Sequence, residues 1–174
     1  MPPSLTVVES PSVVLRTARA ADAAQIHGLI QDHLEEGHLL PRQLEELGVR
    51  APRFVVAVTS DRVVACAELA TLSGAVAEVR SLVVHRDARH DRLGGRLVDE
   101  LVRRARIDGF ETLCAFTHGP GYFVRMGFSI VPHHWVRAKM LVDCQGCPLF
   151  RKCEQHAVVL SLKATGAAAR PLGA

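Results

Sequence analysis

The loop RHDRLGGRL, residues 89–97, combines arginines with a glycine pair directly before a long amphipathic segment. The first N–H groups of a helix have no intrahelical partners, and the helix dipole is positive at that end, so such a loop can bind an anion. Gly94 and Gly95 let the backbone approach the ligand, and the forked donors of arginine suit phosphate oxygens. A pyrophosphate fits the loop better than a carboxylate does, although an ordinary solvated basic loop would have the same composition. The arginines of the loop are Arg89, Arg92 and Arg96.

The segment AVAEVRSLVV, residues 75–84, predicts a strand with two charged side chains on one face. Successive side chains of a strand alternate between its two faces. Two charges on a central strand are costly unless they pair with each other or serve a site. The pattern therefore indicates either an ion pair at a polar end of the sheet or charged groups of an active site. The residues expected to share this face are Glu78, Arg80, Leu82 and Val84.

Three cysteines and a histidine lie close together in DCQGCPLFRKCEQH, residues 143–156. Such a set of soft ligands is enough for a tetrahedral zinc ion, which would be structural, because no open coordination position beside a reactive centre is indicated. A redox pair, or three thiols in a packed loop, would produce the same pattern. The candidate ligands are Cys144, Cys147, Cys153 and His156.

The spacing of apolar residues and of turn residues predicts the elements that would position these groups. Helical periodicity indicates helices within 22–37, 41–48, 93–109 and 119–126. Runs rich in β-branched residues indicate strands at 12–18, in three runs within 53–84, and at 111–117, 127–131 and 156–162.

Length and composition limit the number of domains and the kinds of partner. The chain has 174 residues, of which 48% are hydrophobic and 22% charged, so we expect one globular domain over residues 12–163. The composition of residues 1–11 and 164–174 predicts disorder. No membrane span or secretory signal is visible, which predicts a cytoplasmic protein with no membrane partner. A net charge of +3 is too small to indicate nucleic-acid binding.

The order of the expected elements resembles the GCN5-related N-acetyltransferase (GNAT) family over residues 13–163. The family's loop reads Arg/Gln-x-x-Gly-x-Gly/Ala, and RHDRLGGRL matches it in register, with Arg92 in place of the first glycine. GYFVRMGF at 121–128 is similar to the family's Phe-Tyr-x-x-x-Gly-Phe segment. The resemblance implies an α/β (α+β) fold, with a mixed, mostly antiparallel central sheet flanked by helices and a splayed strand pair at the acetyl-CoA site.

The resemblance also implies how acetyl-CoA is bound. The N–H groups of the loop bind the pyrophosphate, and the backbone of the splayed strand lies along the pantetheine arm. The N–H group of Val83 or Val84 is the expected donor to the oxyanion that forms during transfer. The implied cofactor-binding residues are Leu82, Val83, Val84, Arg89, Arg92, Leu93, Gly94, Gly95 and Arg96.

A transferase of this kind needs a base for the acceptor amine and an acid for the departing thiolate. A glutamate placed like Glu78 resembles the family's base, which often acts through a water. The family's tyrosine acid falls in register on Phe123, so Tyr122, one residue earlier, is the candidate acid, with core packing as the alternative. His118, at the end of a strand, is either a further candidate acid or a structural histidine.

Several segments resemble the stand-alone amino-acid acetyltransferases of the N-acetylglutamate synthase type, namely LLPR at 39–42, AEVRSLVV at 77–84 and DCQGCPLF at 143–150. The resemblance implies transfer to the amine of a small amino acid, glutamate preferred, in arginine biosynthesis, and pairing into a homodimer. A glutamate substrate needs cations for its carboxylates, and the candidates are Arg80, Arg42 and Lys139, for which plain surface charge is the alternative. Other acceptors, namely a protein, a peptide or another small amine, remain open, as does a degenerate acyl-CoA-binding or metal-binding sensor.

Overall fold

The structure is a computed structural model that describes residues 12–37 and 39–163. The segments 1–11 and 164–174, for which the sequence predicts disorder, lie outside the described residues. The strands are β1 (Val14–Thr17), β2 (Phe54–Thr59), β3 (Arg62–Thr71), β4 (Val76–Val84), β5 (Thr112–Thr117), β6 (Ser129–Val131) and β7 (His156–Ser161). The α-helices are α1 (Ala23–Gln31), α2 (Leu44–Arg50), α3 (Leu93–Ile107), α4 (Pro120–Val124) and α5 (Arg137–Lys139). A π-helical turn, Met140–Cys144, follows α5, and short 3₁₀ turns cover Ala20–Asp22, Leu34–Glu36, Ala51–Arg53, Arg86–Asp91, His133–Trp135 and Phe150–Lys152.

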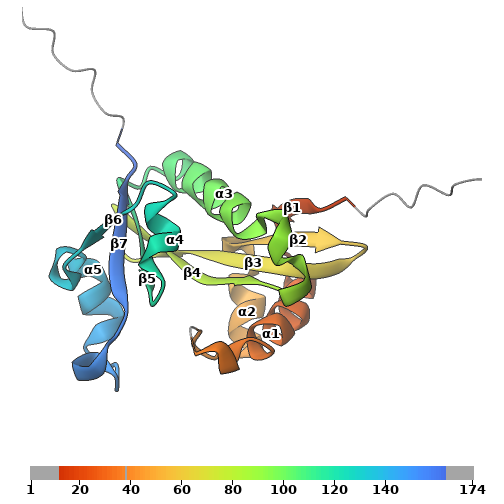
Figure 1. Cartoon of the computed structure of the whole chain (residues 1–174), viewed down its shortest axis with the longest axis horizontal. Coiled ribbons are helices and arrows are strands. Elements are labelled where there is room, and N and C mark those ends of the chain that lie inside the picture. The colour runs from red at the N-terminus through yellow and green to blue at the C-terminus, as the bar shows by residue number, and fades with distance from the viewer. Residues whose placement is uncertain (1–11, 38, 164–174) are drawn as a thin grey trace, which may run out of the picture.

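The described strands form a single sheet of seven strands in the order β1-β2-β3-β4-β5-β7-β6 (Figure 1). Neighbouring strands run antiparallel except β4 and β5, which are parallel. Parallel neighbours need a crossover connection, and α3 supplies it. The mixed, mostly antiparallel sheet flanked by helices that the sequence predicts is therefore confirmed.

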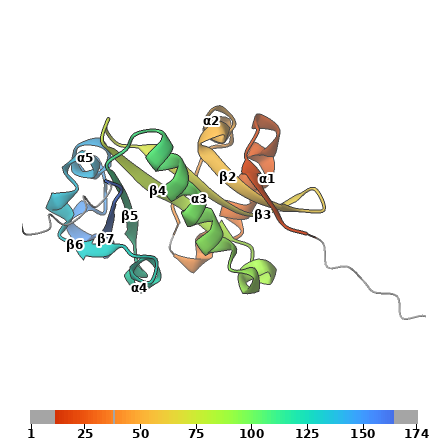
Figure 2. The same ribbon diagram turned by 90° about the horizontal axis from the view of Figure 1, so that it is seen from above.

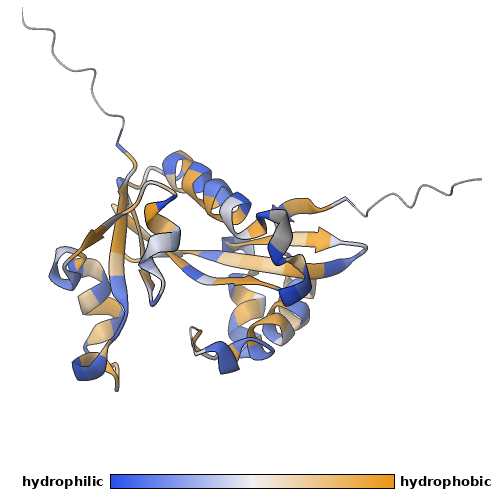
Figure 3. Cartoon of the chain, viewed as in Figure 1, coloured by the Kyte–Doolittle hydropathy of each residue, from blue (hydrophilic) through white to orange (hydrophobic). Residues whose placement is uncertain are grey.

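Helices cover both faces of the half of the sheet that contains β2, β3 and β4, with α3 on one face and α1 and α2 on the other (Figures 1 and 2). Alternate residues of β2 supply the two cores, because successive strand side chains point to opposite faces. Val55 packs in the cluster that contains Leu97 of α3, and Phe54 packs in the cluster that contains Ile26 of α1. Apolar and polar residues alternate along α3 (Figure 3), as expected for a helix with one buried face.

The helix expected at 41–48 begins later and ends later than its sequence signals indicate. Gln43 is extended, with φ −84° and ψ 141°, so α2 begins at Leu44, and it continues through Gly48 to Arg50. Leu47 is completely buried against the α1 side of the sheet. The packing of Leu47 therefore outweighs the low helix propensity of the glycine that follows it.

Candidate active site

The parallel strands β4 and β5 separate after a short paired stretch. They pair only from Val76 to Glu78 on β4, opposite Thr112 to Cys114 on β5, although both strands continue. A cavity of about 1060 Å³ is lined by both strands beyond this point. The splayed strand pair that the sequence predicts is therefore present.

A β-bulge at Ser81 interrupts the pairing of β4 with its other neighbour, β3. Ser81 has a φ of 48°, in the left-handed region that a residue with a side chain rarely adopts. Cys66 pairs with Val83 but Glu68 pairs with Arg80, so the register shifts by one residue between them. The extra residue lies on β4, which must bend there.

The bulge reverses the side-chain alternation of β4. Before it, Val79 packs in the core cluster beneath α3; after it, Leu82 and Val84 pack against the same cluster, whereas Val83 packs on the α1 side. A strict period of two therefore holds only within each half of the strand. The prediction of a single shared face is wrong for this set: Glu78, Arg80, Leu82 and Val84.

Glu78 lies where β4 and β5 separate, and its side chain is 3% exposed. Its carboxylate accepts a hydrogen bond from Arg80 Nε at 2.5 Å and lies 2.7 Å from Lys139 Nζ. Both cations also bind Asp143, Lys139 through Nζ at 2.9 Å and Arg80 through Nη2. The structure thus brings Glu78, Arg80 and Lys139 together at the cavity wall, in a network of alternating charge that Asp143 completes.

Arg42 lines the same cavity, but its donors are directed at protein groups. Its Nη1 donates to Glu68 at 2.8 Å and to Ser81 Oγ at 2.9 Å, and its Nη2 donates to Glu46 at 3.0 Å. Glu68 is fully buried on β3, and Arg50 lies 3.5 Å from its other oxygen. Burial opposes the charged form of Arg42, but the bonds to the two carboxylates raise its pKa overall. An acceptor carboxylate at Arg42 would have to compete with these partners.

The amino end of α3 has no acidic residue in its first turn, and its N-cap side chain makes no capping bond. The N-cap is Arg92, with a left-handed φ of 53° that glycine would adopt without strain. Leu93 is buried and holds this end against the core, while Arg92 and Arg96 are exposed. The N–H groups of Leu93, Gly94 and Gly95 therefore lie at a helix start suited to an anion.

Arg89, the other arginine predicted to bind the pyrophosphate, is tied to the turn after α1. Its Nη2 lies 2.8 Å from each carboxylate oxygen of Glu36, and its Nε donates to the Val84 carbonyl at 3.3 Å. Arg86 binds the same carboxylate at 3.2 Å. The bond from Arg89, reinforced by Arg86, lowers the pKa of Glu36. Arg89 therefore links the end of β4 to the turn that contains Glu36.

Tyr122, the candidate acid, reaches from α4 to the start of α3. A Cβ atom on Gly94 would stand 2.5 Å from Tyr122 Oη, and this buried hydroxyl has no hydrogen-bond partner among the described residues. Burial raises the pKa of Tyr122. Phe123, which occupies the family's tyrosine position, is buried beside Phe128, with ring centroids 5.2 Å apart. Tyr122 and His118, the further candidate acid, both line the cavity.

The cysteine cluster does not form the predicted zinc site. Cys144, Cys147 and Cys153 all line the cavity. Over residues 12–37 and 39–163, however, no three or more His, Cys, Asp or Glu residues are arranged to hold a metal ion. His156 begins β7 and pairs with Thr117 of β5, so its backbone is held in the sheet. Burial raises the pKa of the Cys144 thiol, which makes it a poorer metal ligand and nucleophile at neutral pH.

Two carboxylates of this region, Glu68 and Asp143, are absent from the sequence prediction. The sequence does mark Glu68 as unusual, because it is the single charged residue within the apolar run VVACAELA. Asp143 stands four residues after Lys139, a spacing at which helical side chains meet. Neither signal reveals which cation on another element completes the network.

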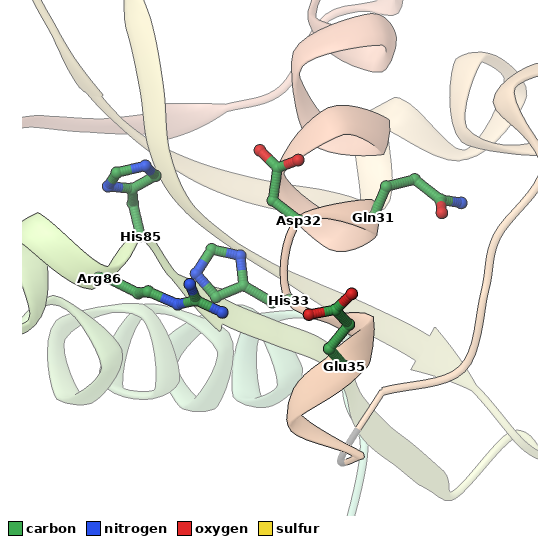
Figure 4. Close-up of a pocket in the computed structure, with 6 residues that line it drawn as sticks. All are labelled: Gln31, Asp32, His33, Glu35, His85 and Arg86. Atoms are coloured by element: carbon green, nitrogen blue, oxygen red, sulfur yellow. The ribbon is translucent and has the colours of Figure 1, made fainter.

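A smaller hollow of about 480 Å³ lies beside the end of α1 (Figure 4). Within it the buried His33 binds the Leu29 carbonyl through Nδ1 at 2.8 Å, and its ring centroid lies 5.9 Å from that of His85. His33 also lines the larger cavity, so the two hollows adjoin there. Acids and bases are mixed in the lining, which favours no single class of ligand. The lining residues are Gln31, Asp32, His33, Glu35, His85 and Arg86.

Comparison with known proteins decides the family. The profile described as the Acetyltransferase (GNAT) family matches residues 22–128. The chain belongs to this acetyltransferase family. It is therefore an enzyme of the N-acetyltransferase class, and the predicted family is confirmed. An uncharacterised N-acetyltransferase of Chlorobaculum tepidum is 30% identical over 148 residues, which are 85% of this chain and 96% of that protein.

Similarity also extends to proteins named for amino-acid substrates. An amino-acid acetyltransferase of Pectobacterium carotovorum is 32% identical over 124 residues, which are 70% of this chain and 28% of that protein. The N-acetylglutamate synthase of Neisseria gonorrhoeae, solved with coenzyme A and N-acetyl-glutamate, has a TM-score of 0.76 and 25% identity, covering 90% of this chain and 36% of that one. This acetyltransferase thus spans only 28% and 36% of the two longer proteins. None of its described helices is long and apolar enough to cross a membrane.

Proposed function

We propose that this N-acetyltransferase transfers the acetyl group of acetyl-CoA to the amine of a small amino acid, with glutamate preferred. The observation that carries the proposal is a buried carboxylate, Glu78, flanked by Arg80 and Lys139 at the point where β4 and β5 separate. A carboxylate can take a proton from an amine, and cations beside it can bind an acidic acceptor. The relatives named amino-acid acetyltransferase and N-acetylglutamate synthase support the same substrate class.

The start of α3 fits the pyrophosphate of acetyl-CoA. It offers unpaired N–H groups, no acidic side chain in its first turn, and open space at Gly95, where a Cβ would meet nothing within 4 Å. We assign the pyrophosphate to the N–H groups of Leu93–Gly95 with Arg89, Arg92 and Arg96 around them. When bound, acetyl-CoA supplies a thioester carbonyl as the electrophile. The backbone of Leu82–Val84 is the proposed wall for its pantetheine arm.

The directions of successive N–H groups along β4 distinguish the two candidate oxyanion donors, Val83 and Val84. The His85 N–H donates to the Val64 carbonyl of β3 at 2.8 Å. Alternate N–H groups of an antiparallel strand point to opposite sides, so Val83 also faces β3 and Val84 faces the side where β5 has separated. We therefore propose the Val84 N–H as the donor to the developing oxyanion.

Glu78 is the proposed general base. Arg80 and Lys139 hold its carboxylate at the cavity wall, where it can accept the ammonium proton of the acceptor. The neutral amine is then the nucleophile. We propose that Tyr122 Oη holds the proton for the departing thiolate, because Tyr122 lines the cavity and its hydroxyl has no hydrogen-bond partner among the described residues. Packing against Gly94 is the competing role for the same hydroxyl.

The carboxylates of the acceptor are assigned to Arg80 and Lys139, whose side chains are 22% and 15% exposed toward the cavity. Arg42 is the third proposed cation. Because its Nη2 is bound to the partly exposed Glu46, an acceptor carboxylate there would displace Glu46 rather than the buried Glu68. N-acetylglutamate would be the product, which would place the enzyme in arginine biosynthesis.

The deciding experiment measures release of the CoA thiol from acetyl-CoA by the purified protein. Each common amino acid is offered in turn as acceptor, and a reaction without acceptor is the control. We expect glutamate to accelerate release more than the other amino acids do. Bound acetyl-CoA with no acceleration by any amino acid would contradict the proposal and direct attention to a larger amine or to a sensor role.

A further inference from the structure

Asp143 binds both cations that the proposed function assigns to the acceptor. Its Oδ2 lies 2.9 Å from Lys139 Nζ and accepts a hydrogen bond from Arg80 Nη2. Arg80 and Lys139 each also bind Glu78. Within this network two carboxylates balance two cations, so no net positive charge is left to attract an acidic acceptor.

The two carboxylates of the network are held very differently. Glu78 is on a paired strand, opposite Ala70 of β3 and Cys114 of β5, and its side chain is 3% exposed. Asp143 is in the π-helical turn Met140–Cys144, and its side chain is 34% exposed. A carboxylate on an irregular, partly solvated turn can be rehydrated when it leaves its partners, whereas a buried one cannot. Asp143 is therefore the carboxylate that can be exchanged.

We propose that Asp143 is an internal carboxylate that occupies the place of an acceptor carboxylate on Arg80 and Lys139 and thereby limits the enzyme's affinity for acidic acceptors. An incoming carboxylate displaces Asp143 and inherits its two cations, while Glu78 stays in place as the base. This proposal rests on the proposed function, in which Arg80 and Lys139 face the acceptor.

In the enzyme without acceptor, the contacts of Asp143 balance the charge of the two cations. Without Asp143, the positive charges of Arg80 and Lys139 in the partly buried cavity wall would be balanced by Glu78 alone, which leaves one charge uncompensated. Asp143 provides that compensation and orients both side chains, but it also competes with the acceptor. An acidic acceptor must therefore present a carboxylate that matches two donors at once, and acceptors without a carboxylate leave the Asp143 contacts intact.

The test compares binding of glutarate, a dicarboxylate with no amine, and glutaramide, its uncharged counterpart, by titration calorimetry in the wild type and in Asp143→Asn. We expect glutarate to bind about tenfold more tightly to the variant, since two partly exposed ion pairs no longer compete, and glutaramide affinity to stay unchanged. Asp143→Glu, which restores the carboxylate, should bind glutarate as the wild type does.

Asp108→Asn is the matched control, because it removes the same charge at an exposed position after α3. A similar gain in that variant would reduce the effect to net charge and overturn the proposal. So would unchanged or weaker glutarate binding in an Asp143→Asn protein that still unfolds cooperatively, since it would make Asp143 a direct binder of the acceptor or a structural residue.

Turnover separates this proposal from the proposed function. With glutamate as acceptor, Asp143→Asn should lower KM by a factor similar to the glutarate effect and leave kcat nearly constant. A wild type that acetylates no amino acid would refute the proposed function. The glutarate comparison would still decide whether Asp143 competes for the two cations.

Discussion

The hydroxyl of Tyr122 fills the space that a side chain at residue 94 would need, with 2.5 Å between Tyr122 Oη and an ideal Cβ on Gly94. Gly94, in the first turn of α3, thus makes room for a contact within the protein, in addition to any ligand. A Cβ atom on Gly95, one residue later, would meet no neighbouring atom within 4 Å. The two glycines are therefore expected to respond differently to the same substitution.

Gly94→Ala should destabilise the fold by about 1–3 kcal/mol, because the new methyl group forces Tyr122 and α4 away from α3. The measurement is the free energy of unfolding in urea. Adding Tyr122→Phe to this variant removes the clashing oxygen and should recover part of the loss. A Gly94→Ala protein as stable as the wild type would show that the tyrosine moves aside freely.

Gly95→Ala should keep or raise stability, by up to about 0.5–1 kcal/mol, because alanine favours the helix and meets no neighbour. Affinity for acetyl-CoA should nevertheless fall, since the methyl group stands at the proposed pyrophosphate site. Calorimetric titration with acetyl-CoA, beside the unfolding measurement, checks both. Undiminished affinity would remove Gly95 from the cofactor site.

Glu78→Gln should lower turnover by about 10²–10⁴-fold, because an amide cannot accept the proton of the amine. Affinity for acetyl-CoA should change little, since Gln keeps the size of the side chain. Steady-state kinetics and cofactor titration give the two numbers. Glu45→Gln, an exposed glutamate on α2, is the control and should retain full turnover. Equal activity of the two variants would exclude Glu78 as the base.

Glu68→Gln should cost about 3–5 kcal/mol of stability, because it leaves the largely buried Arg42 without its main counter-charge. Glu46→Gln removes a carboxylate of the same arginine that is 35% exposed, and should cost only about 0–1 kcal/mol. Urea unfolding of both variants provides the comparison. Equal losses would mean that burial of Glu68 does not distinguish it from Glu46.

The free energy of unfolding at acidic pH should depend on the ionisation of Glu100. Hydrogen bonds from Arg103 and then Arg104 lower the pKa of Glu100 to about 2, from an ordinary value of 4.5. A carboxylate whose pKa is depressed by folding stabilises the protein above its unfolded pKa, and this contribution is lost as the pH falls toward the folded value. Glu100→Gln should therefore flatten the loss of stability between about pH 5 and pH 2. Unfolding midpoints across that range test it, and parallel profiles would argue against it.

Local sequence signals predict most of the elements because they act between neighbours in the chain. Ser60 and Asp61, residues of types that favour turns, connect β2 and β3, and both adopt positive φ, with values of 46° and 62°, as a tight hairpin requires. The glycine pair and the apolar stripe after it predict α3 and its open amino end. The charges of Glu78 and Arg80 within an apolar strand identify the candidate site without any knowledge of the fold.

Contacts between distant segments explain what the sequence does not reveal. The shifted register between β3 and β4 places the bulge at Ser81, and no residue type marks it in advance. The ion-pair network around Arg80 includes Asp143, which is 63 positions away in the chain. Burial and ion pairing depend on which segments meet, and their energies appear only once the chain has folded. The sequence by itself therefore determined the family, the order of elements and the charged residues available for chemistry, and only the tertiary structure decided which of those charges neutralise one another.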